Sequence, residues 1–392
     1  MNIVDITEFY SERGGGIRSH LTARGHVLCQ LGHSHTVIAP GPRNEHRILF
    51  SSDEVGGQDS IQARLVRIGG PSLPYDPTYH VLGHLGRIRR VVRDLRPDVL
   101  EAHSPYLGAA AVLACGRKAA RLRTIFWHAD HIGTYVEPAL SHAFGPVGRN
   151  ALTRPLWMGV RALLARFDAT FVAGVAQATR LREAGVSNII QIPFGVDVDT
   201  FHPREPDPEL RMQLTRGEPG DIIVAAGRLA VEKRWDVVLD AFARVRERRP
   251  AVLVVFGDGP ERARLQRRAP AGVQFLGFEQ DRTKLAKAFA AADVLVHGCP
   301  YETFGLGVAE AIACGLPVVV PDRGGASESV DLSCGAKYPS LDSYACAEAL
   351  ERILVSDRAE LRTLSLAAAA RVTTVREHFK RVLDTYDDLL AT

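Results

Sequence analysis

The sequence predicts an α/β fold made of two doubly wound parallel sheets. Short apolar runs rich in Val, Ile and Ala alternate with longer segments of helical length along nearly the whole chain. This alternation is typical of parallel strands joined by crossover helices. At 392 residues the chain is also too long for one ordinary hydrophobic core, so two domains are expected. The segment 202–220 is rich in Pro, Gly and charge and is interpreted as the linker.

Composition argues against a disordered chain, a disulfide-bonded or zinc-binding framework and a membrane-spanning protein. Hydrophobic residues make up 46% and charged residues 24%, as in ordinary globular proteins. The six cysteines have no CxxC spacing, which favours reduced thiols over a disulfide framework or a zinc site. The first strand starts without a signal-like segment, and no apolar run has the length of a spanning helix. A cytoplasmic protein is expected.

The first half begins with a strand at 1–7, a glycine-rich turn at 14–16 and a helix at 17–31. Glycines at a helix N-terminus allow the backbone to approach an anionic ligand closely, so Gly15 and Gly16 are candidate contacts. The following elements are predicted from the same patterns, with strands at 36–40 and 64–68, loops at 41–60 and 69–77, and a helix at 78–96.

Two later strands end in histidine. They cover 98–103 and 124–128, and their last residues are His103 and His128. Ligands bind at the carboxyl ends of strands in open α/β sheets, which makes both side chains candidates for a site. A capping or core histidine is the alternative. The next segment, 132–148, is aromatic and has little helical period, so a long loop is expected there.

In the second half, cations follow the strand 221–226. Arg228 and Lys233 stand at the turn from this strand to a helix. Two fixed cations at such a corner suit a pyrophosphate.

The sequence Asp197-x-Asp199 looks like a metal-binding pair, but the glycine and proline around it favour a hinge.

The stretch 299–310 carries two carboxylates eight positions apart, Glu302 and Glu310, on either side of Phe304-Gly305-Leu306. A buried strand at 293–297 is predicted before it and a helix at 308–313 after it. Amides at a helix start suit an anion, and carboxylates accept hydrogen bonds from hydroxyl groups. This predicts a sugar-nucleotide site. Two solvated glutamates at an ordinary helix start are the alternative.

Together with 252–260 and 323–328, these motifs resemble, in order, the retaining glycosyltransferases of the GT-B fold, family 4 (group 1). Glu302 and Glu310 match the family's E-x7-E pattern. The resemblance covers nearly the whole chain and implies two facing Rossmann-like domains with a cleft between them. It implies an acceptor-binding domain at 1–198, a nucleotide-sugar-binding domain at 199–370, and a helix at 371–392 that crosses back onto the first domain.

The resemblance further implies transfer of a hexosyl group, with retention, from a nucleoside diphosphate sugar to a lipid-linked or glycan acceptor. A UDP-sugar is favoured as donor and GDP-mannose comes next. Neither a metal nor another cofactor is expected, and no nucleic-acid partner. The implied catalytic residues are His128, Arg228, Lys233 and Glu302, and the implied donor-binding residues are Gly15, Gly16, Arg228, Lys233, Phe304, Gly305, Leu306 and Glu310.

Two other functions stay open at this point. One is a sugar-nucleotide epimerase or hydrolase, and the other is a sugar-nucleotide-binding protein without activity. Charge suggests a further partner, because residues 1–198 carry a net +6 and the rest −3. Arg89, Arg93 and Arg96 fall on one helix face and could contact an anionic membrane peripherally, on its inner face. Solvated arginines are the alternative.

Overall fold

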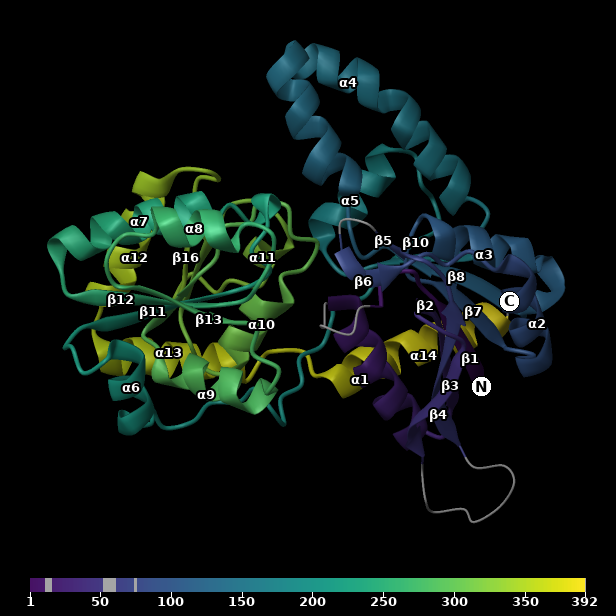
Figure 1. Cartoon of the computed structure of the whole chain (residues 1–392), viewed down its shortest axis with the longest axis horizontal. Coiled ribbons are helices and arrows are strands. Elements are labelled where there is room, and N and C mark those ends of the chain that lie inside the picture. Colours follow the sequence, from purple (N-terminus) through teal and green to yellow (C-terminus); the bar gives the residue numbers. More distant parts are fainter. Residues whose placement is uncertain (11–15, 52–60, 74–75, 392) are drawn as a thin grey trace. The chain divides into compact units, whose positions relative to one another are not determined.

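The computed structural model describes residues 1–10, 16–51, 61–73 and 76–391, and it forms two compact units. The first comprises Met1–Pro193 and Val375–Thr392, and the second comprises Phe194–Thr374 (Figure 1). The candidate Gly15 lies outside the described residues.

The first unit is built on an eight-stranded sheet in the order β10-β9-β8-β7-β1-β2-β4-β3. All neighbouring strands are parallel except β3 and β4, which are antiparallel. The switch point of the chain lies at β1, which pairs with both β2 and β7. The strands are β1 (Asn2–Ile6), β2 (Ser34–Gly41), β3 (Glu45–Ser51), β4 (Gln62–Gly69), β7 (Val99–Ala102), β8 (Leu122–Phe126), β9 (Ala169–Val172) and β10 (Ile189–Gln191), with a separate pair of β5 (Ser72–Leu73) and β6 (Asp76–His80).

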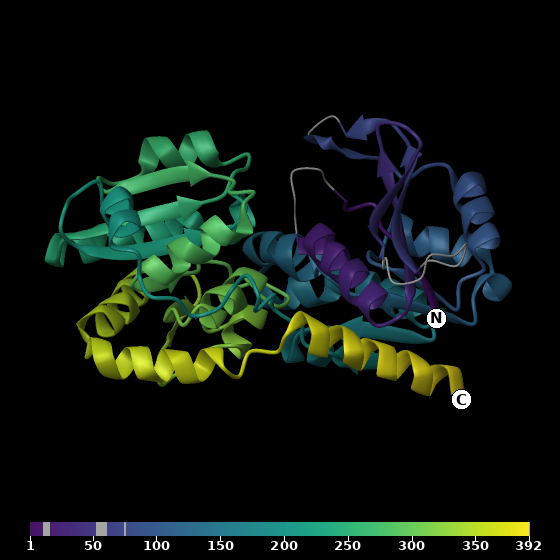
Figure 2. The ribbon, with the colours of Figure 1, turned by 90° about the horizontal axis from the view of Figure 1, so that it is seen from below.

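Helices cover both faces of this sheet. Along β2, Ile38 belongs to a core with α2, α3 and α5, whereas Val37 and Ala39 pack with α1. The last helix, α14, packs against α1 and β8 (Figure 2). The helical elements are α1 (Gly16–Gln30), α2 (Leu85–Leu95), α3 (Leu107–Cys115), η1 (Arg117–Ala119), η2 (Ile132–Val136), α4 (Glu137–Leu164), α5 (Val175–Glu183) and α14 (Val375–Ala391).

The second unit has a six-stranded parallel sheet in the order β13-β12-β11-β14-β15-β16. The strands are β11 (Asp221–Ala226), β12 (Ala251–Phe256), β13 (Val273–Gly277), β14 (Val294–Val296), β15 (Val318–Pro321) and β16 (Ala336–Tyr338). Alternate residues of β11 enter two separate cores, Ile222 and Val224 on one face, Ile223 and Ala225 on the other. Such double burial explains why these strands are continuous apolar runs.

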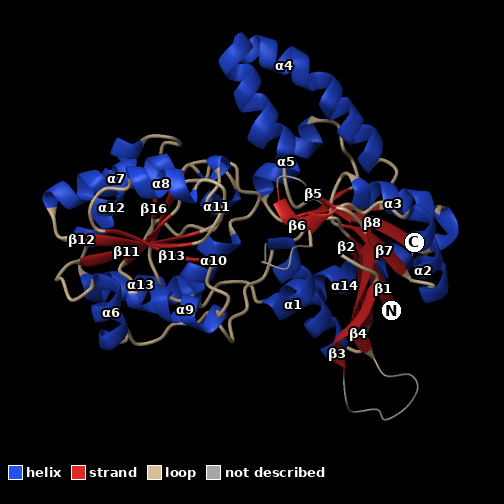
Figure 3. Cartoon of the chain, viewed as in Figure 1, coloured by secondary structure: helices blue, strands red, loops and turns tan. Residues whose placement is uncertain are grey.

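Helices flank this second sheet on both sides (Figure 3). One core includes residues of α6, α9, α10 and α13, and the other includes residues of α7, α8 and α12. The helical elements are α6 (Pro208–Thr215), η3 (Val231–Lys233), α7 (Trp235–Arg248), α8 (Arg262–Arg268), α9 (Arg282–Ala291), α10 (Leu306–Ala313), α11 (Gly325–Glu328), α12 (Ser343–Val355) and α13 (Arg358–Ala369). The predicted fold class of two doubly wound sheets is thereby confirmed.

Several local predictions were wrong. The segment 132–148 is not a loop, because η2 and the first part of α4 cover it. Gly145, with φ 67° and ψ −178°, kinks α4, and this interruption hid the helical period. The predicted loop 41–60 contains β3, an exposed edge strand whose mixed polar residues gave no strand pattern. The predicted helix 78–96 starts only at Leu85, after strand β6.

Candidate functional site

The carboxyl edge of the second sheet brings two of the predicted residues together. Lys233 follows β11 and Glu302 follows β14, and these neighbouring strands form the switch point of the sheet. The Lys233 Nζ donates a hydrogen bond to Glu302 Oε1. His297 Nε2 lies 3.4 Å from the same carboxylate oxygen. The site thus holds a carboxylate between an ammonium and an imidazole.

This ion pair shifts both pKa values. Burial opposes ionisation of Glu302, but Lys233 and His297 outweigh it and lower the pKa of the carboxyl group. Burial likewise disfavours the charged form of Lys233, yet Glu302 raises its pKa. Both groups are therefore charged at neutral pH. An ammonium has three donors, so Lys233 can hold Glu302 and still donate to an anion.

Arg228 stands at the same turn with an exposed side chain. Two hydrogen bonds fix the peptide group that joins Arg228 to Leu229. Its carbonyl accepts a hydrogen bond from Trp235 Nε1 at 2.9 Å, and the next amide, of Leu229, donates to the Asp258 carbonyl at 2.9 Å. The fold therefore presents Arg228 and Lys233 from one rigid corner at the carboxyl edge of β11.

The start of α10 offers unpaired amides. The first hydrogen bonds of the helix run from Val308 and Ala309 to the Gly305 carbonyl, so the amides of Leu306 and Gly307 have no intrahelical acceptor. Gly305 has φ 84°, and a Cβ there would come within 2.7 Å of the Ala326 Cβ. Only glycine fits this close packing of the loop against α11. The arrangement suits a phosphate or a group of hydroxyls.

Phe304 and Glu310 lie on either side of this helix start. The Phe304 ring packs edge-to-face on Phe194, with centroids 5.3 Å apart. Glu310 is buried on α10 and accepts a hydrogen bond from Arg282 at the start of α9. Burial raises the pKa of Glu310 to about 7, and Arg282 only partly opposes it. The carboxyl group therefore changes charge near neutral pH.

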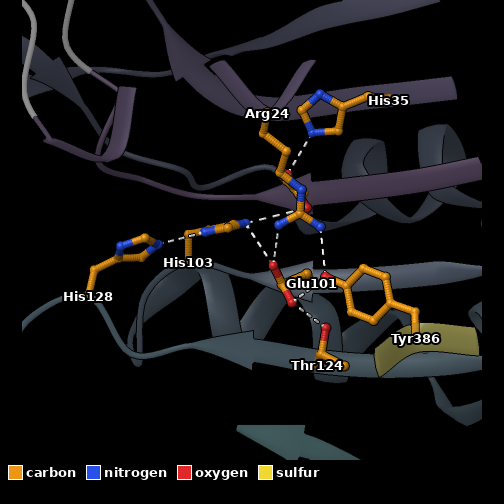
Figure 4. A network of polar contacts seen from close by, with 8 residues as sticks. Arg24, His35, Glu101, His103, Thr124, His128 and Tyr386 are labelled. Atoms are coloured by element: carbon orange, nitrogen blue, oxygen red, sulfur yellow. Dashed lines mark hydrogen bonds and ion pairs between the residues drawn. The ribbon is translucent and has the colours of Figure 1, made fainter. Parts of the chain in front are cut away.

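In the first unit, His128 lies just beyond the carboxyl end of β8, beside His103 at the end of β7 (Figure 4). His128 Nε2 and His103 Nδ1 are 2.8 Å apart and share a hydrogen bond. The other nitrogen of His103, Nε2, lies 3.3 Å from Asp5 Oδ1 and 3.4 Å from Glu101 Oε1. These contacts place the His103 ring between the buried carboxylates and His128.

A buried cation completes this cluster. Arg24, on α1, donates a hydrogen bond to Glu101 and lies 3.4 Å from Asp5. Tyr386, on α14, accepts from Arg24 at 2.7 Å and donates to Glu101 at 2.8 Å, and Thr124 donates to Glu101 at 2.6 Å (Figure 4). The chain thus ties its first strand, its first helix and its last helix together through charges that are nearly inaccessible to solvent.

Electrostatics keep His128 neutral. Burial lowers the pKa of its imidazole well below the usual value, and His103 and Arg24 lower it further. For Asp5, burial favours the neutral acid, but Arg24, His103 and His35 outweigh it and lower the pKa. A neutral imidazole that is hydrogen-bonded to His103 can form a hydrogen bond with a hydroxyl group of a ligand.

Gly16, the other candidate of the glycine-rich turn, is the first residue of α1, and a Cβ there would meet no atom within 4 Å. Among the described residues, three groups of His, Cys and acidic side chains place ligand atoms within 4.8 Å of one another. One of these groups contains Glu302, and another contains both Asp5 and Glu101. Those carboxylates already have internal cations as partners, which a metal would have to displace.

The sequence did not identify most of the buried cluster. Asp5, Arg24, Glu101 and Tyr386 were not candidates, nor was Arg282 beside Glu310. A usable signal was present in the strands, since Asp5 and Glu101 interrupt otherwise apolar runs. A buried carboxylate requires a partner.

Comparison with known proteins gives a consistent result for both units. Residues 14–200 match the family model described as Glycosyltransferase Family 4, and residues 220–356 match the model described as Glycosyl transferases group 1. A GDP-mannose-dependent alpha-(1-6)-phosphatidylinositol dimannoside mannosyltransferase of Mycobacterium tuberculosis is 31% identical, with 96% of each chain covered. A GDP-mannose-dependent alpha-mannosyltransferase of the same species is 31% identical over 83% of this chain and 80% of that protein.

Among solved structures, a sucrose-phosphate synthase from Thermosynechococcus elongatus has the same fold, with a TM-score of 0.76 at 21% identity. The match covers 100% of this chain and 99% of that one. Within the described residues, no helix combines the length and the apolar character needed to cross a membrane.

Proposed function

The chain belongs to the retaining glycosyltransferases of family 4 (group 1), which have the GT-B fold, and on this premise we propose that it transfers a mannosyl group from GDP-mannose to a membrane lipid acceptor. The observation that carries this proposal is the 31% identity, over 96% of both chains, to an enzyme named for GDP-mannose and a phosphatidylinositol dimannoside. The sequence alone favoured a UDP-sugar and placed GDP-mannose second. Because these relatives are named for GDP-mannose, we propose GDP-mannose as the donor.

In the proposed mechanism, Arg228 and Lys233 hold the pyrophosphate and offset the charge that develops on the leaving group. The amides at the start of α10 add to this stabilisation. Glu310 accepts hydrogen bonds from the ribose, Glu302 from the sugar, and His128 contacts the sugar. These are the predicted roles, and the Lys233–Glu302 pair supports them, because it aligns a phosphate-binding cation with a hydroxyl-binding carboxylate.

The carboxylate arrangement disfavours a double displacement. Glu302 is charged and already paired with Lys233, and Glu310 is paired with Arg282. Neither is a free nucleophile. Front-face attack, with the leaving phosphate accepting the proton of the acceptor hydroxyl, fits these groups better. The cations take the place of a metal, so chelators should not inhibit transfer.

Membrane contact is proposed through α4, which projects from the first unit as a bent helix (Figure 1). Phe144 and Val147, on either side of the kink at Gly145, are 62% and 84% exposed. Exposed arginines, Arg154 and Arg161, follow on the second arm. Apolar side chains next to cations suit an anionic bilayer surface. Since α4 follows the carboxyl end of β8, it lies on the chain directly after the His128 loop.

The donor test is turnover of GDP-mannose, UDP-glucose and UDP-galactose with vesicles that contain phosphatidylinositol mannosides. Mannosylated lipid should form from GDP-mannose, with retained anomeric configuration. Transfer from a UDP-sugar alone would overturn the donor assignment, and release of free mannose without lipid product would overturn the acceptor assignment. Vesicle binding should fall for Phe144→Ser/Val147→Ser, with Met212→Ser, an exposed residue of the second unit, as the control.

A further inference from the structure

A basic groove lies at the opposite edge of the first sheet from His128. It is a cavity of about 920 Å³ formed by α2, the end of α3, η1 and the residues that precede β7 and β8. Its volume is in the range of small-ligand sites. Because β8 has five residues, the groove and the His128 loop are separated by about 17 Å of strand. We call it the amino-edge groove.

Seven cations line the amino-edge groove, and none of its lining residues is acidic. They are Arg89, Arg90, Arg93, Arg96, Arg117, Lys118 and Arg121. Three have a carboxylate within 4.0 Å, namely Arg93 with Asp94, Arg117 with Asp168, and Arg121 with Asp98. In the part of the chain that the structure describes, Arg89, Arg90, Arg96 and Lys118 have no such ion pair. The groove therefore has a large excess of positive charge.

Two helix ends act against this charge only weakly. The C-termini of α2 and α3, at Arg96 and Gly116, both end at the groove. Each contributes roughly half a negative charge through its carbonyl groups. That is small compared with four uncompensated full charges. Like charges brought together repel each other unless an anion lies between them, so the groove is electrostatically suited to a multivalent anion.

We propose that the amino-edge groove binds an anion that carries two or more phosphate groups. Six of the seven cations are arginines, whose planar guanidinium groups donate paired hydrogen bonds to phosphate oxygens. Such an anion has two possible sources, a soluble polyphosphorylated compound or the phosphorylated headgroup of a lipid. The site is separate from the donor site of the proposed function, which lies on the other unit.

The test measures binding to the full-length protein in excess GDP, so that a donor site for nucleotides is filled. One arm titrates inorganic triphosphate by calorimetry. The other arm sediments phosphatidylcholine vesicles with and without phosphatidylinositol phosphate. Arg89→Gln/Arg96→Gln should weaken binding of the ligand by roughly twenty-five-fold, because each cation near an anionic phosphate contributes about a factor of five.

The matched control, Arg43→Gln/Arg47→Gln, removes two exposed arginines of the same unit, one just before β3 and one within it. Its affinity should stay within about twofold of the wild type. Triphosphate binding that only the groove variant loses identifies a soluble ligand, and loss confined to the phosphatidylinositol phosphate vesicles identifies a headgroup. Equal weakening in both variants, or no binding of either ligand to the wild type, overturns the proposal. Mannosyl transfer is not the readout, so failure of the proposed function leaves this result interpretable.

Discussion

The carboxyl edges of the two sheets use charge in different ways. In the second unit, Arg228 is exposed and the Lys233–Glu302 pair is half-buried at the end of the strands. In the first unit, Asp5, Arg24 and Glu101 are almost completely inaccessible to solvent and lie within the strands and helices themselves. The first arrangement can reach a ligand. The second can act only through its neighbours.

This difference suggests that the charges of the second unit act mainly on turnover and those of the first unit mainly on stability. In the proposed mechanism the charges of the second unit stabilise charge that develops during the reaction, so their loss should lower turnover more than stability. The buried cluster of the first unit joins β1, α1, β7 and α14 and orients His103 and His128, so its loss should lower stability first. The distinction would be wrong if loss of the second unit's charges lowered stability more than turnover, or if loss of the buried cluster lowered turnover without lowering stability.

The largest effect is expected at Arg24. Arg24→Met leaves Asp5 and Glu101 buried without their guanidinium partner, which should lower the free energy of unfolding by about 3–5 kcal/mol. Urea denaturation followed by tryptophan fluorescence measures this loss, since Trp127 and Trp157 report on the first unit. Arg87→Met, at an exposed position of α2, should change stability by no more than about 0.5 kcal/mol. Equal stability of the two variants would contradict the assigned role of the cluster.

The next effect concerns turnover. Lys233→Ala should lower kcat/KM by about a hundredfold or more, as for loss of one preorganised electrostatic donor. Added Mg²⁺ should not restore activity, and EDTA should not inhibit the wild type. Lys287→Ala, on the exposed side of α9, provides the control. Inhibition by EDTA that Mg²⁺ reverses would overturn the metal-free mechanism.

The same contrast explains what the sequence could predict. Arg228, Lys233, Glu302 and Glu310 lie in two short stretches whose spacing is local, so the motif could be recognised from the order of residues alone. The buried cluster is dispersed, and Glu101 and Tyr386 are 285 positions apart. Their contact depends on β1 lying between β2 and β7 and on the return of α14. Neither follows from local patterns, and only the family resemblance implied the return of the last helix.

The fold class followed from the alternation of strand-like and helix-like segments, which is dictated by burial on both sheet faces. Irregular features did not follow from it. At α4, Gly145 breaks the helical phase, so the apolar residues before and after the kink do not fall on one face. At β3, an edge strand has one solvated side, and its polar residues obscured the strand pattern.

Glu310 gives a prediction of intermediate size. Glu310→Ala should weaken GDP binding by about 1.5–3 kcal/mol, the range for hydrogen bonds to a charged group. Glu360→Ala, an exposed glutamate of α13, is the control and should bind GDP like the wild type. Unchanged affinity of Glu310→Ala would exclude the ribose contact.

The pH dependence of GDP binding tests the same residue. The pKa of Glu310 is raised to about 7, so the carboxylate that we propose accepts hydroxyl hydrogen bonds is present above that pH and is protonated below it. Affinity should therefore decline as the pH falls from 8 to 6 and level off above the pKa. Glu310→Gln should lack this limb, because an amide does not titrate. A limb that persists in Glu310→Gln would assign the titration to another group.

The smallest effect is expected at Tyr386. Its hydroxyl group accepts from Arg24 and donates to Glu101, but both partners keep other contacts, Arg24 with Asp5 and Glu101 with Thr124. Tyr386→Phe removes one shared hydrogen-bonding group and leaves no charge unpaired, so the unfolding free energy should fall by about 0.5–1.5 kcal/mol. Because His103 still lies against Asp5, kcat/KM should change by less than about twofold. Tyr344→Phe, 65% exposed on α12, is the matched control. If Tyr386→Phe lowered kcat strongly without lowering stability, the buried cluster would act on catalysis directly, and the contrast between the two units would fail.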